Sequence, residues 1–292
     1  MKFPYPLLNE QSARTKVNQL GATKRPFLLI VSYDKRQNYL IPLDEINPKA
    51  ILFDYPNLKN SASLLPKNEP ILWESMPISF HKYEQAFKEL MPFLKRGETA
   101  LANLTFPTKV KSNLSLKAMF LRSQAKYRLY LQDHFVSFSP ETFITINEGE
   151  IATYPMKGTI NADLPEAEFR LMNDEKEQKE HLTIVEEAKQ DLAQVAQNIR
   201  VPKFRYVDRL ERTERDGSSG AILQTSSKIA GDLPKNFHQK LGDLLFKLLP
   251  ASSITGSPRA KTVEILQGIE TYSRGFYSGI AGIFDGENFD SA

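Results

Sequence analysis

Four short apolar runs follow one another between residues 127 and 155, and their spacing restricts the fold more than any other feature of the chain. Each run is rich in β-branched or aromatic residues, and turn-like polar or glycine residues separate it from the next. The runs are YRLYLQ (127–132), HFVSFS (134–139), TFITIN (142–147) and EIATYP (150–155). This spacing predicts four strands that form an antiparallel meander.

The apolar period becomes helical after residue 173. Asp174 and Glu177 form a plausible capping pair at the start of 174–199, where one apolar face predicts the longest helix of the chain. That face consists of Leu182, Val185, Leu192, Val195 and Ile199. A second amphipathic helix is predicted from Phe80, with a stop at Lys95-Arg96-Gly97.

Strand-prone segments also occur near both ends of the chain. Segments 26–33 and 38–43 flank the polar DKRQ and predict a hairpin, while 50–55 predicts a third strand and 276–285 a final one. A further strand region near 204–229 and helices over about 235–249 and 258–272 are expected between them. This order of strands, helices and strands favours an α+β fold over a doubly wound parallel sheet.

Composition excludes several classes of protein. The chain of 292 residues has no cysteine, which excludes disulfides, thiolate metal sites and a cysteine nucleophile. Its 38 lysines and arginines exceed its 35 acidic residues by three, too small an excess to favour nucleic acid as a partner. No apolar run has the length of a signal or membrane-spanning segment, so a cytoplasmic protein without membrane contact is expected.

Two residues could carry covalent or acid–base chemistry. Glu141 follows a predicted strand beside apolar neighbours, where desolvation could raise its pKa and suit a general acid; a solvated turn carboxylate is the alternative. Lys157 lies in PMKGT between a stiffening proline and a permissive glycine, and a partly desolvated lysine there could act as an amine nucleophile. An ordinary turn lysine is the alternative.

Two further segments could bind ions or anionic groups. Glu177 and Glu180 stand three residues apart on one helical face and could share Mg²⁺, although both also suit a helix N-terminus. In SSITGSPRAK, Ser257 is expected to cap a helix that begins at Pro258, which would leave backbone amides free for a carboxylate or phosphate. Plain capping is the alternative there.

The order of these segments resembles a known family. Six segments are similar, in the same order along the chain, to motifs of the chorismate-utilising enzymes, over about residues 80–290. They are SPETF, PMKGT, KEQKEHLTIV, QTSSKI, SSITGSPRAKTVEIL and RGFYSGIAGIF. The resemblance implies large, mainly antiparallel sheets packed with helices, as in anthranilate synthase component I. It also implies a chorismate-binding catalytic core over 76–292, with residues 1–75 as a short strand-rich part of the same fold.

Lys157 narrows the resemblance, because aminodeoxychorismate synthases typically have lysine where anthranilate and isochorismate synthases have alanine. The resemblance then implies amination of chorismate at C4 in p-aminobenzoate and folate biosynthesis, with Lys157 as nucleophile and Glu141 as general acid. Glu177 and Glu180 would hold Mg²⁺. The residues that would bind substrate are Gly158, Thr159, Gln224, Thr255, Gly256 and Arg259. Anthranilate synthase component I and a non-catalytic chorismate- or partner-binding subunit are the alternatives.

The ammonia for this reaction implies a partner. Because the family's glutaminase uses a cysteine, this chain is expected to receive ammonia from a separate glutamine amidotransferase subunit. The sequence departs from the family where Gln224 replaces a frequent histidine and Arg259 a usual lysine. The family's C-terminal strand, loop and helix, with an E-x-x-E pair at the metal site, have no counterpart before Ala292, so we expect this sequence to be truncated.

Overall fold

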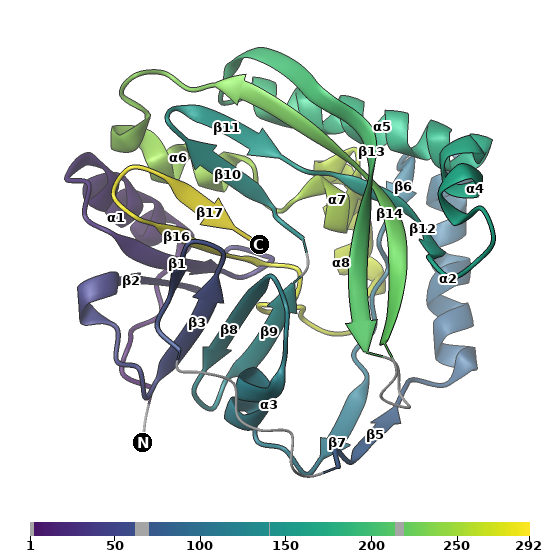
Figure 1. Cartoon of the computed structure of the whole chain (residues 1–292), viewed down its shortest axis with the longest axis horizontal. Coiled ribbons are helices and arrows are strands. Elements are labelled where there is room, and N and C mark those ends of the chain that lie inside the picture. Colours follow the sequence, from purple (N-terminus) through teal and green to yellow (C-terminus); the bar gives the residue numbers. More distant parts are fainter. Residues whose placement is uncertain (1–2, 62–69, 140, 214–218) are drawn as a thin grey trace.

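The chain forms two main sheets that meet near the centre of the molecule (Figure 1). The computed structural model describes residues 3–61, 70–139, 141–213 and 219–292. The large sheet contains, in spatial order, β12 (Met156–Asn161), β14 (Ser219–Asp232), β11 (Glu150–Thr153), β10 (Ile144–Asn147), β17 (Phe289–Ser291), β16 (Ile280–Phe284), β1 (Phe27–Val31) and β2 (Asn38–Pro42), and β13 (Gln197–Thr213) also pairs with β14.

Three smaller sheets complete the strand arrangement. They consist of β4 (Leu58–Lys59), β3 (Ile51–Tyr55), β8 (Tyr127–Leu131) and β9 (Phe135–Ser139); of β15 (Gly256–Ser257) and β6 (Leu101–Ala102); and of β5 (Trp73–Met76) and β7 (Lys109–Ser112). Every pairing between strands of the described ranges is antiparallel. The predicted α+β fold with large antiparallel sheets is therefore confirmed.

Strand β1 holds the two main sheets together because both of its faces are buried. The hairpin predicted for the N-terminal region is confirmed, with Phe27 opposite Pro42 in β2 and opposite Phe284 in β16. Leu28 and Ile30 pack against the sheet that contains β3 and β8. The alternate residues of β1 pack against helices on the opposite face. A strand buried on both faces reads as a continuous apolar run, which explains FLLIV.

The predicted four-stranded meander is wrong in one respect. Strands β8 and β9 pair with each other, and β10 pairs with β11, but β9 and β10 belong to different sheets. The chain crosses between the sheets at residues 139–143, of which residue 140 lies outside the described ranges. Local strand spacing contains no signal for such a crossing, because it does not show which sheet each hairpin joins. The same segment contains Glu141.

Helices cover the outer face of the large sheet and one of its ends. The described helices are α1 (Glu10–Ala22), α2 (Phe80–Lys95), α3 (Leu116–Arg122), α4 (Ala167–Asn173), α5 (Glu175–Ala193), α6 (Leu241–Lys247), α7 (Ser252–Thr255) and α8 (Arg259–Ile269), with 3₁₀ turns at Leu43–Glu45 and Phe237–Lys240. Helix α1 was not predicted from the sequence. Its buried positions are only Ala13, Val17 and Gly21, an apolar stripe too narrow to stand out.

Helix α5 confirms the predicted longest helix and its cap. The Asp174 carboxylate accepts from the backbone N–H of Glu177 at 2.9 Å. The helix ends at Ala193, so Ile199 belongs to β13 instead, and Leu182 is 51% exposed rather than buried. The buried face instead contains His181, Ile184, Val185 and Leu192. A polar histidine at the centre of this face is tolerated because its ring nitrogens find partners on β14.

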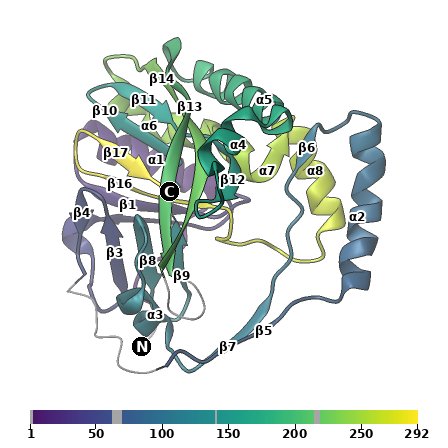
Figure 2. The ribbon, with the colours of Figure 1, turned by 45° about the vertical axis from the view of Figure 1, so that its right-hand side comes forward.

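Helix α2, also predicted, packs on α8 at the edge of the molecule away from β3 and β4 (Figure 2). The segment from Lys59 to Pro77, which ends where the core expected over 76–292 begins, contains β5, and its residues 62–69 lie outside the described ranges. None of the helices in the described part of the chain is long and apolar enough to cross a bilayer.

Candidate active site

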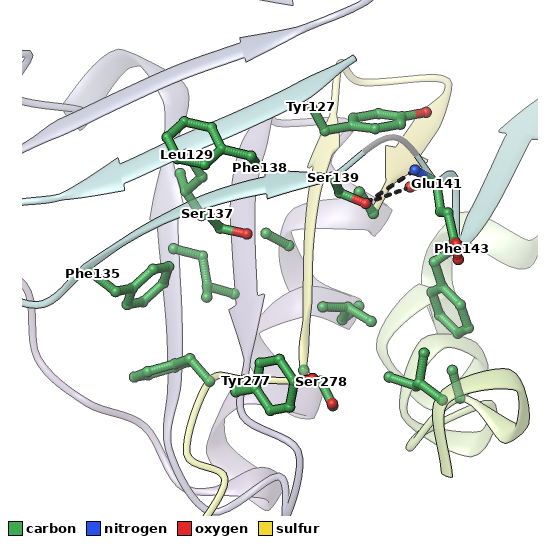
Figure 3. A pocket seen from close by; sticks show the side chains of 18 of the residues that line it. Tyr127, Leu129, Phe135, Ser137, Phe138, Ser139, Glu141, Phe143, Tyr277 and Ser278 are labelled. Atoms are coloured by element: carbon green, nitrogen blue, oxygen red, sulfur yellow. Dashed lines mark hydrogen bonds between the residues drawn. The ribbon is translucent and has the colours of Figure 1, made fainter. Parts of the chain in front are cut away.

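Two cavities meet at the segment that links the two main sheets. The smaller one, of about 280 Å³, lies between β12, α5 and the segment around α7; we call it the lysine cavity because Lys157 lines it. The larger one, of about 600 Å³, lies beside β8 and β9, with Tyr127, Ser137 and Tyr277 in its wall (Figure 3). Glu141 and Phe143 line both cavities, so the crossing segment forms their common wall.

Lys157 reaches the lysine cavity from an irregular point of strand β12. The pairing of β12 with β14 shifts register between Lys157 and Thr159, and Gly158 between them has a φ of +73°. A Cβ on Gly158 would lie 3.1 Å from Oε2 of Glu177 and 3.2 Å from Leu171. Glycine is therefore required both for the left-handed backbone and for the close approach of helix α5. This bulge places the Glu177 carboxylate against the residue that follows Lys157.

Glu141 lies on the linking segment, and the residue as a whole is exposed. Its backbone N–H donates to the Ser139 hydroxyl at 3.1 Å, and that hydroxyl donates to the Glu141 carbonyl at 3.0 Å (Figure 3). Desolvation of the carboxyl raises the pKa of Glu141, and the positive charge of Lys157 opposes this rise as the smaller effect. Lys157 and Glu141 are thus brought to one cavity, with the carboxyl shifted toward its protonated form.

A chain of hydrogen bonds holds the backbone of Lys157 from behind. The Thr225 hydroxyl on β14 donates to the carbonyl oxygen of Lys157. The Thr225 oxygen lies 3.4 Å from Nδ1 of His181, whose Nε2 lies 2.7 Å from the Ser227 hydroxyl. The Ser227 oxygen also accepts from the backbone N–H of Arg205 at 2.8 Å. His181, Thr225 and Ser227 are all fully buried.

The proton directions in this chain follow from its two ends. Because the Thr225 hydroxyl proton goes to Lys157, its oxygen can only accept from His181, so Nδ1 of His181 carries the ring proton. Burial, aided by the charge of Arg205, lowers the pKa of His181 to about 4. The ring is therefore neutral at pH 7, and its Nε2 accepts from Ser227. Each hydroxyl and ring nitrogen of this chain is therefore a defined donor or acceptor, and the chain holds the Lys157 carbonyl in place.

Glu177 and Glu180, the predicted magnesium ligands, lie in the first turns of α5. Glu180 is 3.5 Å from Lys176, and Glu177 approaches Gly158. Within the described ranges no three histidine or acidic residues come together as a metal site. Magnesium in proteins is often held by one or two carboxylates, with water and substrate oxygens as its other ligands. Glu177 beside the lysine strand and Glu180 one turn further on provide oxygen donors of that class, although neither lines the lysine cavity itself.

Gln224 and Thr159, predicted to contact substrate, face each other across β14 and β12. Gln224 is 5% exposed, and its amide donates to the Met156 sulfur at 2.8 Å. Thr159 is exposed. Neither residue lines the lysine cavity, and nor does Gly158. The structure therefore brings Lys157 and Glu141 to the cavity and leaves these three in the strands behind it.

The segment 253–259 differs from its predicted geometry. Ser257 does not cap a helix; it pairs with Leu101 in a two-stranded ladder, and α8 begins one residue later than expected, at Arg259. Thr255 is fully buried, and Gly256 packs against the carbonyl of Leu101. A strand pairing consumes the backbone groups that a cap would have left free, and sequence spacing alone does not distinguish the two.

The Arg259 side chain binds backbone carbonyls at the C-terminal end of α6. Its guanidinium donates to the carbonyls of Leu248 at 2.9 Å and Lys247 at 3.1 Å. It also lies 3.3 Å from Asp191, which lines the lysine cavity. Arg259 thus contacts two residues of the cavity wall, Asp191 and Leu248, without lining the cavity itself. The residues around it that do line the cavity are Ser252, Ser253 and Ile254.

Sequence reasoning missed two acidic residues of the cavity wall, Glu187 and Asp191 on α5. They stand four residues apart on one helical face, and Glu187 follows Glu180 by seven residues, the spacing of two helical turns. That periodicity could have revealed them.

Comparison with known proteins places this arrangement in a family. The model of a family described as chorismate binding enzyme matches residues 11–292. An uncharacterized PabA-like protein from Haemophilus influenzae is 44% identical over 277 residues, which cover 95% of this chain and 83% of that protein. Aminodeoxychorismate synthase component 1 from Klebsiella aerogenes is 25% identical over 269 residues, which cover 87% of this chain and 56% of that protein, and proteins named anthranilate synthase component 1 match at similar identities.

The fold agrees with this assignment. A solved structure from Bacillus anthracis, described as a 2,3-dihydroxybenzoate-specific isochorismate synthase, superposes with a TM-score of 0.69 at 20% identity, covering 99% of this chain and 79% of that one. At this identity the likeness shows the fold alone. The family match over almost the whole chain and the relative at 44% identity show that this chain belongs to the chorismate-binding enzyme family.

Proposed function

We propose that this chain is the chorismate-aminating subunit of an aminodeoxychorismate synthase. The observation that carries the proposal is the presence of Lys157 and Glu141 in the wall of one cavity of about 280 Å³. A lysine amine and a carboxyl with a raised pKa are the pair that a two-step displacement of a hydroxyl needs. The family match supports chorismate as the substrate.

The first step is addition of the Lys157 amine to C2 of the chorismate ring. Both ring double bonds shift as the bond from C4 to its hydroxyl breaks, and Glu141 protonates the departing oxygen so that it leaves as water. Division of one poor displacement into two substitutions is the usual advantage of covalent catalysis. The hydrogen-bond chain through Thr225 and His181 fixes the position from which the amine attacks.

In the second step ammonia adds at C4, both ring double bonds return to their original positions, and the bond between C2 and Lys157 breaks to give 4-amino-4-deoxychorismate. Glu177 and Glu180 would hold Mg²⁺ with the substrate carboxylate. When bound, the ion neutralises negative charge on that carboxylate. Glu177 approaches Gly158, the residue after Lys157, so this carboxylate lies next to the lysine strand.

The source of the ammonia is a separate protein in this proposal. Without a cysteine, the chain cannot perform the cysteine-dependent glutaminase reaction itself. We therefore propose a glutamine amidotransferase partner, with ammonium salts as a substitute in vitro. A cytoplasmic location stays a prediction.

The test is turnover of chorismate with magnesium and ammonium by the wild-type chain and by Lys157→Ala. We expect aminodeoxychorismate without pyruvate, and loss of this product in the variant. Release of pyruvate with fluorescent anthranilate would assign the chain to anthranilate synthase instead. Binding of chorismate without either product would assign it a non-catalytic role, and wild-type activity in Lys157→Ala would refute the two-step mechanism.

A further inference from the structure

One carboxylate in the wall of the lysine cavity has an oxygen that no protein group satisfies. Oε2 of Glu187 on α5 is buried and has no hydrogen-bond partner among the described residues. A buried charged oxygen without a donor has lost the hydrogen bonds it would make in water, and no protein group replaces them. An unsatisfied acceptor at a cavity wall is therefore a feature that a ligand with N–H or O–H donors can relieve.

The neighbouring carboxylates on the same helix do not share this property. Asp191, one turn further along, accepts from the Ser252 hydroxyl at 2.6 Å and lies 3.3 Å from Arg259. Glu186 is exposed and pairs with Lys189 at 2.9 Å. Glu187 alone of these three combines a place in the lysine cavity with a free acceptor.

The charge of Glu187 restricts what it can bind. Chorismate carries two carboxylates, and a third carboxylate in the cavity repels them rather than holding them. The remaining reactant of the proposed amination is ammonia, which arrives in neutral water mainly as ammonium, a cation with four N–H donors. A carboxylate with an unused oxygen is complementary to that cation in both charge and hydrogen bonding.

We propose that Glu187 is the ammonium-binding residue of the lysine cavity and the base that converts ammonium to the ammonia that attacks chorismate. This inference rests on the amination reaction proposed above. In this role Glu187 touches the second substrate, while Lys157 and Glu141 act on the first. The two sets of groups line one cavity from different elements, α5 on one side and β12 with the linking segment on the other.

The atoms and charges balance through both steps. Glu141 gives one proton to the departing hydroxyl, which leaves as water. Ammonium gives one proton to Glu187, and the resulting ammonia forms the C4–N bond with its lone pair. The C2–N bond then breaks, its electron pair stays on Lys157, and the lysine returns as a neutral amine. The product amine is positively charged, and the proton on Glu187 replaces the one that Glu141 has lost.

The test compares Glu187→Gln with the matched control Glu186→Gln, which changes the adjacent, exposed carboxylate. Steady-state rates are measured against ammonium at saturating chorismate and against chorismate at saturating ammonium. We expect Glu187→Gln to raise the KM for ammonium at least about tenfold, the loss of one charge-assisted contact, and to leave the KM for chorismate within about twofold. Glu186→Gln is expected to match the wild type in both.

A pH series adds a readout that loss of packing would not change. As pH rises, more of the added ammonium is already ammonia and needs no base, so the deficit of Glu187→Gln should shrink when rates are plotted against total ammonium. The other charged groups that line the cavity, Lys157, Glu141 and Asp191, are present in both proteins, so the comparison isolates the change at Glu187. A deficit that stays constant across this series would overturn the assignment of Glu187 as the base.

The outcomes for the two proposals are separable. If the wild-type chain does not aminate chorismate, the proposed function fails. If the wild type aminates chorismate and Glu187→Gln has the wild-type KM for ammonium, only the present inference fails. Should Glu187→Gln not fold, Glu187→Asp serves instead, because it keeps the charge but withdraws it by about one bond length, and an unchanged KM for ammonium in that variant would equally refute the assignment.

Discussion

The two walls of the lysine cavity hold their reactive groups by different means. Lys157 lies on a strand of the large sheet, and its carbonyl is bonded by Thr225, which in turn contacts the buried His181. Glu141 lies on the segment between the two sheets and is held by local hydrogen bonds to Ser139. The proposed nucleophile is fixed by long-range contacts of the sheet, whereas the proposed acid depends on two hydrogen bonds to one neighbouring residue. We infer that the precision of the reaction resides mainly in the strand wall.

Lys157→Ala tests the strand wall with the largest expected effect. Removal of a covalent nucleophile leaves no route through the two-step reaction, so kcat should fall by roughly 10³-fold or more. The measurement is the rate of aminodeoxychorismate formation, accompanied by mass spectrometry for a chorismate adduct on the intact protein. Lys157→Arg keeps the charge but not the nucleophile and should be equally inactive; activity in either variant would show that the strand wall does not carry the chemistry.

Glu141→Gln tests the linking segment and should lower kcat by about 10²-fold, within the usual range for a general acid. The acid works when protonated, so wild-type kcat should decline as pH rises through the pKa of Glu141. Because desolvation raises that pKa above its ordinary value of 4.5, the decline should lie above pH 4.5. The variant should lack it. A decline shared by both proteins would assign the pH dependence to another group.

Thr225→Val asks whether the hydrogen-bond chain positions Lys157. Loss of the hydroxyl frees the Lys157 carbonyl, so we expect kcat to fall about tenfold with little change in KM. Thr225→Ser restores the donor and should restore kcat. Thr262→Val is the matched control, because Thr262 is also fully buried and hydrogen-bonded but lies on α8, away from the cavity. Equal losses of kcat in both valine variants would indicate a general effect of destabilisation.

Gly158→Ala and Ser139→Ala compare the stability of the two walls. Alanine at Gly158 must adopt a φ of +73° and press on Glu177, which should cost about 1–3 kcal/mol of unfolding free energy. Ser139→Ala removes only exposed local bonds and should cost less than about 0.5 kcal/mol. Chemical denaturation measures both. Equal costs would contradict the view that the strand wall is the more constrained of the two.

The sequence was most informative where a local pattern decides the structure. Helix α5, its Asp174 cap and the β1–β2 hairpin follow from periodicity and capping chemistry over a few residues. The narrow stripe of α1 escaped notice because its buried residues are small. The crossing between β9 and β10 depends on which distant strands each hairpin meets, which alternation does not encode.

The same division applies to the candidate site. Lys157 and Glu141 could be selected from their neighbours and from the family resemblance. Ser257 could not be placed correctly, because its pairing with Leu101 is a contact between segments far apart in the sequence. Glu187 was missed because its importance lies in the absence of a partner for Oε2 within the described structure. Such an absence becomes visible only when the surrounding elements have been assembled.

The large sheet also has a consequence for the timing of folding. Strand β1, near residue 30, pairs with β16, near residue 280, and β17 lies between β16 and β10. During synthesis the edge of β1 that pairs with β16 therefore stays unpaired until nearly all of the chain described here has emerged. Sequence-distant pairings of this kind slow folding and lengthen exposure to aggregation. We expect newly made chains to need chaperones more than the finished protein's buried core would suggest.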